Sequence, residues 1–160
     1  MKGATISAMA ASLILVCVSA FYMAEVESAR DAELWNMIYS DYSYDYYDYG
    51  PSESDELTQT GATISILFIL GITFVNIMCI AKIKTMTSKV IGIIGTSLSG
   101  ISLLFAVVMM TDPGASSFDE GGAVILLYGL VMIAFTVVLT VQAFKPAKGA
   151  TATPKIDEID

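Results

Sequence analysis

Histidine is absent from the chain of 160 residues, and charged side chains are scarce. The lack of histidine excludes bis-histidine haem ligation, the usual histidine-based zinc sites and a histidine general base. Charged residues make up 15% of the chain, whereas a soluble domain usually carries about 25%. The mean hydropathy of +0.68 and the 55% of hydrophobic residues are typical of a membrane protein.

Four apolar runs contain no Asp, Glu, Lys or Arg: residues 4–24, 61–81, 90–111 and 122–144. At a rise of 1.5 Å per residue, each run is about 30 Å long as a helix, which matches the hydrocarbon core of a bilayer. None of the runs has the polar face that a helix of a soluble bundle needs. The sequence therefore predicts a single all-α membrane domain over residues 1–160, an antiparallel bundle of four transmembrane helices.

The charges between these runs predict the orientation in the membrane. Residues 25–60 hold ten acids and one base, Arg30, and residues 112–121 hold three acids and no base. Residues 82–89 hold three lysines and no acid, and further lysines flank the outermost runs at Lys2, Lys145 and Lys148. The positive-inside rule places both termini, the loop 82–89 and the tail 145–160 in the cytoplasm. The acidic loops 25–60 and 112–121 are then extracellular, and the predicted location is the cell membrane.

The first run allows a second interpretation. Lys2, a short apolar core and a small residue at Ala20 also fit a secretory signal peptide cleaved after residue 20. The apolar run continues through Phe21, Tyr22 and Met23, which favours a retained transmembrane helix.

One short word occurs twice. The sequence GATIS stands at residues 3–7 and again at 61–65, at the start of the first two runs. The match does not extend further along the chain. We interpret the two copies as convergence on small residues at helix starts, where backbones approach closely, and not as a duplication.

Several enzyme and transporter classes lack the residues that they need. A small drug/proton antiporter requires a carboxylate inside a span, and the four runs contain none. The two cysteines, Cys17 and Cys79, would lie at depths about 15 Å apart, which is too far for a disulfide. We expect both thiols to be small packing residues. The glycine-rich stretch 92–100 lies inside an apolar run, where no nucleotide reaches it. We predict that the protein is not an enzyme and holds no cofactor or metal.

Small residues line one face of the third run at spacings of three and four. They are Gly92, Gly95, Ser99, Ser102 and Ala106. Because lipid tails give helices no hydrophobic reason to associate, close backbone approach must supply it, so this stripe predicts a helix–helix seam. A pore-lining face is the alternative, although ion paths usually need charged or strongly polar rings.

Asn76 is the most polar residue deep in any run. It lies six residues before Lys82, about 9 Å from the inner face, at nearly the depth of Thr96 and Ser97. We expect Asn76 to hydrogen-bond across to the third helix as a packing residue, with substrate binding as the alternative.

Six of the eight tyrosines lie between residues 39 and 49, in the first outer loop. Residues 25–38 lack Gly and Pro, so the first helix can continue outward and place Leu34 and Trp35 near the headgroups. Tyrosine and tryptophan are favoured in binding surfaces. The predicted partner contacts are Trp35, Tyr42, Tyr44, Tyr46, Tyr47 and Tyr49. Two alternatives are a merely solvated acidic loop and calcium binding by Asp41, Asp45 and Asp48, whose spacing matches no EF-hand.

The function predicted from these features is that of a non-enzymatic accessory or structural subunit of a larger membrane complex. The expected partners are the lipid bilayer and larger integral membrane proteins or further copies of the chain, with no nucleic acid. The long first outer loop and its Leu34–Trp35 pair resemble claudin-like tetraspan proteins in outline, which implies adhesion or barrier formation as an alternative. The loop lacks the cysteine pair that staples the outer sheet of that family. A small channel or transporter is the third interpretation, disfavoured by the uncharged spans.

Overall fold

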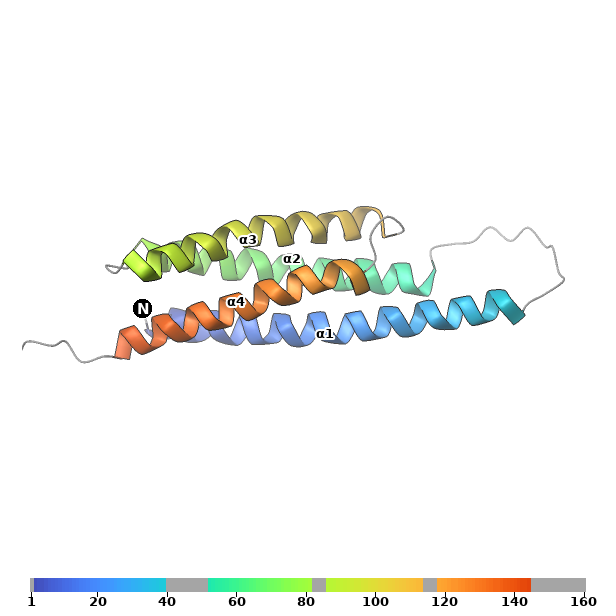
Figure 1. The fold of residues 1–160 in the computed structure, drawn as a ribbon, viewed down its shortest axis with the longest axis horizontal. Helices are drawn as coiled ribbons and strands as arrows, with labels where there is room; N and C mark the ends of the chain where they lie inside the picture. Colours follow the sequence, from blue (N-terminus) through green and yellow to red (C-terminus); the bar gives the residue numbers. More distant parts are fainter. Residues whose placement is uncertain (1, 40–51, 82–85, 114–117, 145–160) are drawn as a thin grey trace, which may run out of the picture.

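The computed structural model describes residues 2–39, 52–81, 86–113 and 118–144, which form four α-helices (Figure 1). These are α1 (Lys2–Tyr39), α2 (Glu53–Ile80), α3 (Met86–Thr111) and α4 (Phe118–Phe144). All four are long and apolar enough to cross a membrane. The prediction of an all-α bundle with four spanning helices is confirmed.

Successive helices run in opposite directions and pack side by side, with α4 closing the bundle against α1. Among the described residues, α1 and α3 do not contact each other, so they lie diagonally opposite, and α2 and α4 touch across the centre. The start of α1 and the end of α4 lie at one end of the bundle, which we name the terminal end (Figure 1). The opposite end, where α1 stops and α2 begins, is the loop end.

Each helix turns one narrow stripe of residues toward the bundle axis, with spacings of three and four. On α1 the first five buried positions are Thr5, Ala8, Ser12, Leu15 and Ser19, and on α3 they are Ser88, Gly92, Gly95, Ser99 and Ser102. This alternation is the heptad spacing of left-handed helix packing, in which the helices cross at about 20°. The four stripes meet as antiparallel seams.

The interior of the bundle mixes polar and apolar residues. Hydroxyl, amide and glycine residues lie there beside large side chains such as Met132 and Phe135. On the outside, large apolar side chains such as Leu67, Phe74 and Leu104 are about two-thirds exposed, at 68%, 67% and 66%. Water would penalise such a surface, but lipid tails do not. Together with the length and hydropathy of the helices, this arrangement makes the chain a multi-pass membrane protein with four spans.

Two helices extend past the predicted spans at the loop end. α1 continues fifteen residues beyond residue 24, and α2 begins at Glu53, eight residues before the predicted span. The predicted continuation of the first helix is confirmed, and it follows from the lack of Gly and Pro in residues 25–38. α2 begins after Ser52, whose extended backbone and side-chain hydrogen bond from the Asp55 amide make a standard N-cap.

Candidate functional site

The α3 stripe predicted as a seam faces α2 and α4. All five residues, Gly92, Gly95, Ser99, Ser102 and Ala106, are buried. A Cβ atom added at Gly92 would lie 2.6 Å from Cγ1 of Ile80 in α2 and 3.1 Å from Cζ of Phe135 in α4. One added at Gly95 would lie 2.9 Å from the sulfur of Met132. The missing side chains on α3 thus make room for large side chains on its neighbours.

Asn76 joins α2 to α3 near the terminal end. Its Nδ2 donates hydrogen bonds to Oγ1 of Thr96 at 2.9 Å and to the Gly92 carbonyl at 3.2 Å. The Thr96 hydroxyl donates to the same carbonyl at 2.9 Å. The side chain is 3% exposed, and its Oδ1 has no hydrogen-bond partner in the described part of the chain. This triangle of polar groups lies where Gly92 lets the two backbones approach.

A second polar contact crosses the centre of the bundle. The Tyr128 hydroxyl of α4 and Oγ1 of Thr73 in α2 are 3.1 Å apart, and Tyr128 is fully buried. Sequence reasoning missed this pair. The available signal was a lone tyrosine in the middle of an apolar run, since a buried phenol usually finds a hydrogen-bond partner.

The two cysteines occupy different environments. Both are free thiols, and Cys79 is 5% exposed in the core. Cys17 is exposed on α1, so the expectation that both thiols are small packing residues is wrong for Cys17. The small size of Cys17 did not reveal which way it faces, because every face of the first run is apolar. Within the described ranges no three His, Cys, Asp or Glu residues gather as metal ligands.

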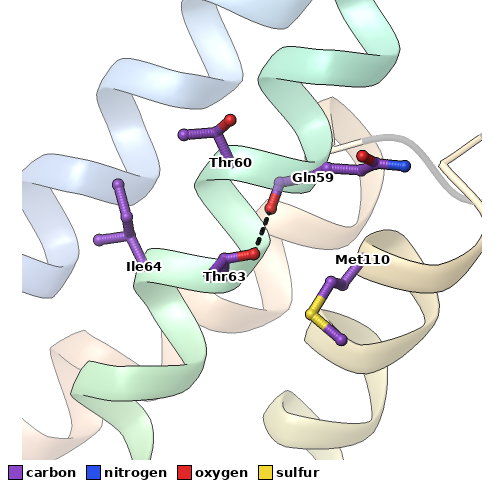
Figure 2. A pocket seen from close by; sticks show the side chains of 5 residues that line it. All are labelled: Gln59, Thr60, Thr63, Ile64 and Met110. Carbon is purple, nitrogen blue, oxygen red and sulfur yellow. Dashed lines mark hydrogen bonds between the residues drawn. The ribbon is translucent and has the colours of Figure 1, made fainter. Parts of the chain in front are cut away.

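A shallow groove lies between α2 and α3 near the loop end (Figure 2). It has a volume of about 320 Å³ and is lined by Gln59, Thr60, Thr63, Ile64 and Met110. The Thr63 hydroxyl is already engaged, since it donates to the Gln59 carbonyl at 2.8 Å. The lining offers no charged group and no base that could activate its threonine hydroxyls, and the groove is open to its surroundings. It therefore lacks the enclosure and convergent polar groups of a small-molecule site.

A carboxylate of α1 caps the start of α2 at the loop end. The two oxygens of Glu33 accept separate hydrogen bonds from Ser54, one from its backbone amide at 3.0 Å and one from its hydroxyl at 2.9 Å. The first four amides of a helix have no partner within the helix, and its N-terminus carries a partial positive charge. Glu33 meets both needs, and we name this contact the Glu33–Ser54 clamp. Sequence reasoning did not single out either residue.

Beyond the clamp, α1 ends in a set of exposed apolar side chains. They are Leu34, Trp35, Met37 and Ile38, with exposed fractions of 48%, 58%, 68% and 66%, and we name them the α1 tip. Trp35 is the only member that the sequence predicted as a partner contact. The other predicted contacts, Tyr42, Tyr44, Tyr46, Tyr47 and Tyr49, lie outside the described residues, as do the calcium candidates Asp41, Asp45 and Asp48.

Comparison with known proteins adds no identity. No protein-family model, no curated protein and no solved structure matches the chain. Of the surfaces that the structure describes, the loop end is the most distinctive.

Proposed function

We propose that the protein is a non-enzymatic accessory or structural subunit of a larger membrane complex, and that it contacts its partners through the loop end. The observation that carries this proposal is the projection of α1. The helix continues fifteen residues past its span, is held to α2 by the Glu33–Ser54 clamp, and ends in exposed apolar side chains. An exposed apolar set rimmed by charged residues is typical of an interaction site.

The proposed orientation has the loop end outside the cell and the terminal end in the cytoplasm. The distribution of charge supports it. In the sequence, Lys82 and Lys84 lie between α2 and α3, and Lys89 lies near the start of α3, which is at the terminal end. Seven acids of α1 and α2 lie between their predicted spans and the tip, with Arg30 as the one base among these helical residues. Short basic links are retained in the cytoplasm during insertion.

The interior of the bundle supports a structural role. Several of its buried hydroxyls donate to a carbonyl of their own helix, as Ser12 does to Ala8, Ser102 to Leu98 and Thr136 to Met132. The contacts of Asn76 and Tyr128 join neighbouring helices. No charged side chain lies among the buried residues of the described helices. Ion and proton paths usually require charged or strongly polar groups within the spans. Among the buried residues that the structure describes there is no charged group, and the Asn76 amide is bonded to α3.

Purification in a gentle detergent followed by mass spectrometry tests the proposal. We expect larger membrane proteins to co-purify in fixed stoichiometry with the wild-type chain. Changing Tyr42, Tyr44, Tyr46 and Tyr47 to Ser should remove part or all of this association, because buried tyrosine anchors contribute strongly to binding. The helical content should stay the same. The change leaves the net charge untouched, so a loss of binding could not be due to lost electrostatic attraction. A chain that purifies only with itself contradicts the proposal: association between opposing membranes would favour adhesion, and a ring within one membrane would favour a pore.

A further inference from the structure

We propose that the α1 tip binds a basic segment of a protein partner that carries at least one large apolar side chain. This inference rests on the proposed function and goes further, because it assigns the contact to four residues and specifies the chemistry of what they bind.

The tip presents one broad apolar face. With successive residues 100° apart on a helix, Leu34, Trp35, Met37 and Ile38 span about 160° of the circumference. Asn36 lies on the opposite side of the same turn. All four apolar side chains are roughly half to two-thirds exposed, although they lie at the end of a helix whose earlier turns are packed in the bundle, as the fully buried Val26 shows. The face is therefore built on a fixed element, and Leu34, Met37 and Ile38 are exposed on it.

A first span that ends at residue 24, as the sequence predicts, would leave the tip outside the membrane. The predicted first span ends at residue 24, and Trp35 and Ile38 lie about 16 and 21 Å further along the axis of α1. The headgroup layer adds only about 5–8 Å on each side of the hydrocarbon core, and an average tilt of about 20° shortens these heights by less than a tenth. Because α1 is an unbroken helix, this predicted span end would place Trp35 beyond the headgroups, further out than the position near the headgroups that the residue pattern suggests.

The acidic residues around the α1 tip favour a partner segment of positive charge. Glu25, Glu27, Asp31 and Glu33 precede the tip on α1, and Glu53, Asp55 and Glu56 form the first turn of the adjacent helix. Arg30 is the one base among these two stretches, so together they carry a net charge of −6. A second copy of the chain would bring the same acids into contact with them, and residues 40–51 add three further aspartates and no base. Like charges in contact are unfavourable, so a basic partner is the complementary one.

The tip also suits the side chains of a basic segment. A lysine or arginine can stack on the face of an indole, and Trp35 is the only tryptophan in the chain. Leu34 and Ile38 lie one turn apart and form an apolar strip along which an aliphatic side chain can lie. The Glu33–Ser54 clamp ends one residue before this strip, so little ordering of α1 is needed on binding.

Photo-crosslinking in the source cell tests the inference. A photoreactive amino acid is placed at Ile38, in the middle of the apolar face, and as a matched control at Asn36, on the same turn and the opposite side. We expect an adduct from position 38 at a yield at least about fivefold above that from position 36, and a crosslinked peptide with a net positive charge. An adduct with a second copy, with lipid or with an acidic or neutral peptide overturns the inference, and so does an equal or absent yield.

A variant without a crosslinker supplies the second readout. The double variant L34S/I38S preserves the charge. It should lower co-purification of the partner that crosslinking identified at least about tenfold, because buried apolar anchors dominate binding. Both positions are exposed, so the unfolding midpoint should match that of the wild type. Unchanged recovery overturns the inference. If larger proteins still co-purify with the wild-type chain while position 38 gives no adduct, the assigned site is wrong and the subunit function stands; a chain without partners rejects the function itself.

Discussion

Replacing Glu33 by Ala should destabilise the bundle from its loop end. The change removes both acceptors of the Glu33–Ser54 clamp, at 3.0 and 2.9 Å, and a negative charge from the N-terminus of α2. A hydrogen bond to a charged acceptor contributes about 1.5–3 kcal/mol, and a carboxylate at a helix N-terminus about 0.3–1 kcal/mol. Water can replace part of the loss because the contact is only partly buried, so we expect a net destabilisation of about 1.5–3 kcal/mol.

The measurement is thermal unfolding in a mild detergent, followed by circular dichroism. For a chain of this size, 1 kcal/mol corresponds to about 2–4 °C, so E33A should lower the midpoint by about 3–12 °C. E33Q keeps one acceptor and loses the charge, and should fall between E33A and the wild type. Glu27, exposed on the same helix, provides the control: E27A should change the midpoint by less than about 2 °C, since exposed substitutions usually cost within 0.5 kcal/mol.

A double-mutant cycle with S54A separates the clamp from general effects of charge. If Glu33 acts through Ser54, the two substitutions should be non-additive, with a coupling of about 1 kcal/mol or more. Additive effects, or equal shifts for E33A and E27A, would refute the reasoning. The loss would then come from the overall charge of the loop end and not from the capping contact.

Three further predictions concern topology and the α2–α3 seam. A cysteine placed at Ser52 should react with an impermeant thiol reagent in intact cells and one at Thr87 should not; the opposite labelling would reverse the proposed orientation. Ser99→Leu should overpack the seam and cost about 1–3 kcal/mol of stability in detergent, whereas Leu104→Ala on the exposed face should be nearly neutral; the reverse order would mean that the faces are misassigned. Asn76→Leu should remove the hydrogen bonds to α3 and lower the unfolding free energy by about 1 kcal/mol, and a stabilised variant would contradict this role.

Composition and spacing were enough to predict the coarse architecture. The four uncharged runs identify the spans because no other fold tolerates about 21 consecutive apolar residues four times over. The hydrogen bond between Asn76 and Thr96 could also be predicted, since a short link makes α2 and α3 antiparallel neighbours and the depths of the two residues match. Both inferences use only positions along the helix axis.

Rotation about the helix axis could be predicted for α3, where small residues mark one face, but not for a run without such a stripe. When every face of a run is apolar, hydropathy does not show which face turns inward, so the exposure of Cys17 could not be predicted. The same limit applies to the contact between Tyr128 and Thr73, which crosses the bundle diagonally. The Glu33–Ser54 clamp depends in addition on the register between α1 and α2, which the length of the intervening segment does not determine.

The two copies of the GATIS word differ in which of their residues are buried. In the first copy Thr5 is buried and Gly3 has no atom within 4 Å of an added Cβ. In the second copy the corresponding Thr63 is exposed, whereas Gly61 packs against Tyr22 and Phe118. Identical words thus present different residues to the interior. This agrees with convergence on small residues rather than with a repeated structural unit.

The uninterrupted course of α1 has a mechanical consequence. Its 38 residues form one rod about 57 Å long, with no proline and no glycine between Ala4 and Tyr39 to act as a hinge. Such a rod works as a lever: a tilt of about 5° displaces one end relative to the other by about 5 Å. Where α4 crosses it, a Cβ at Gly129 would lie 2.7 Å from Val16, so the two helices are in close contact at that point and can serve as a fulcrum. A force applied to α1 on one side of the membrane would then displace its other end laterally, without any change in secondary structure.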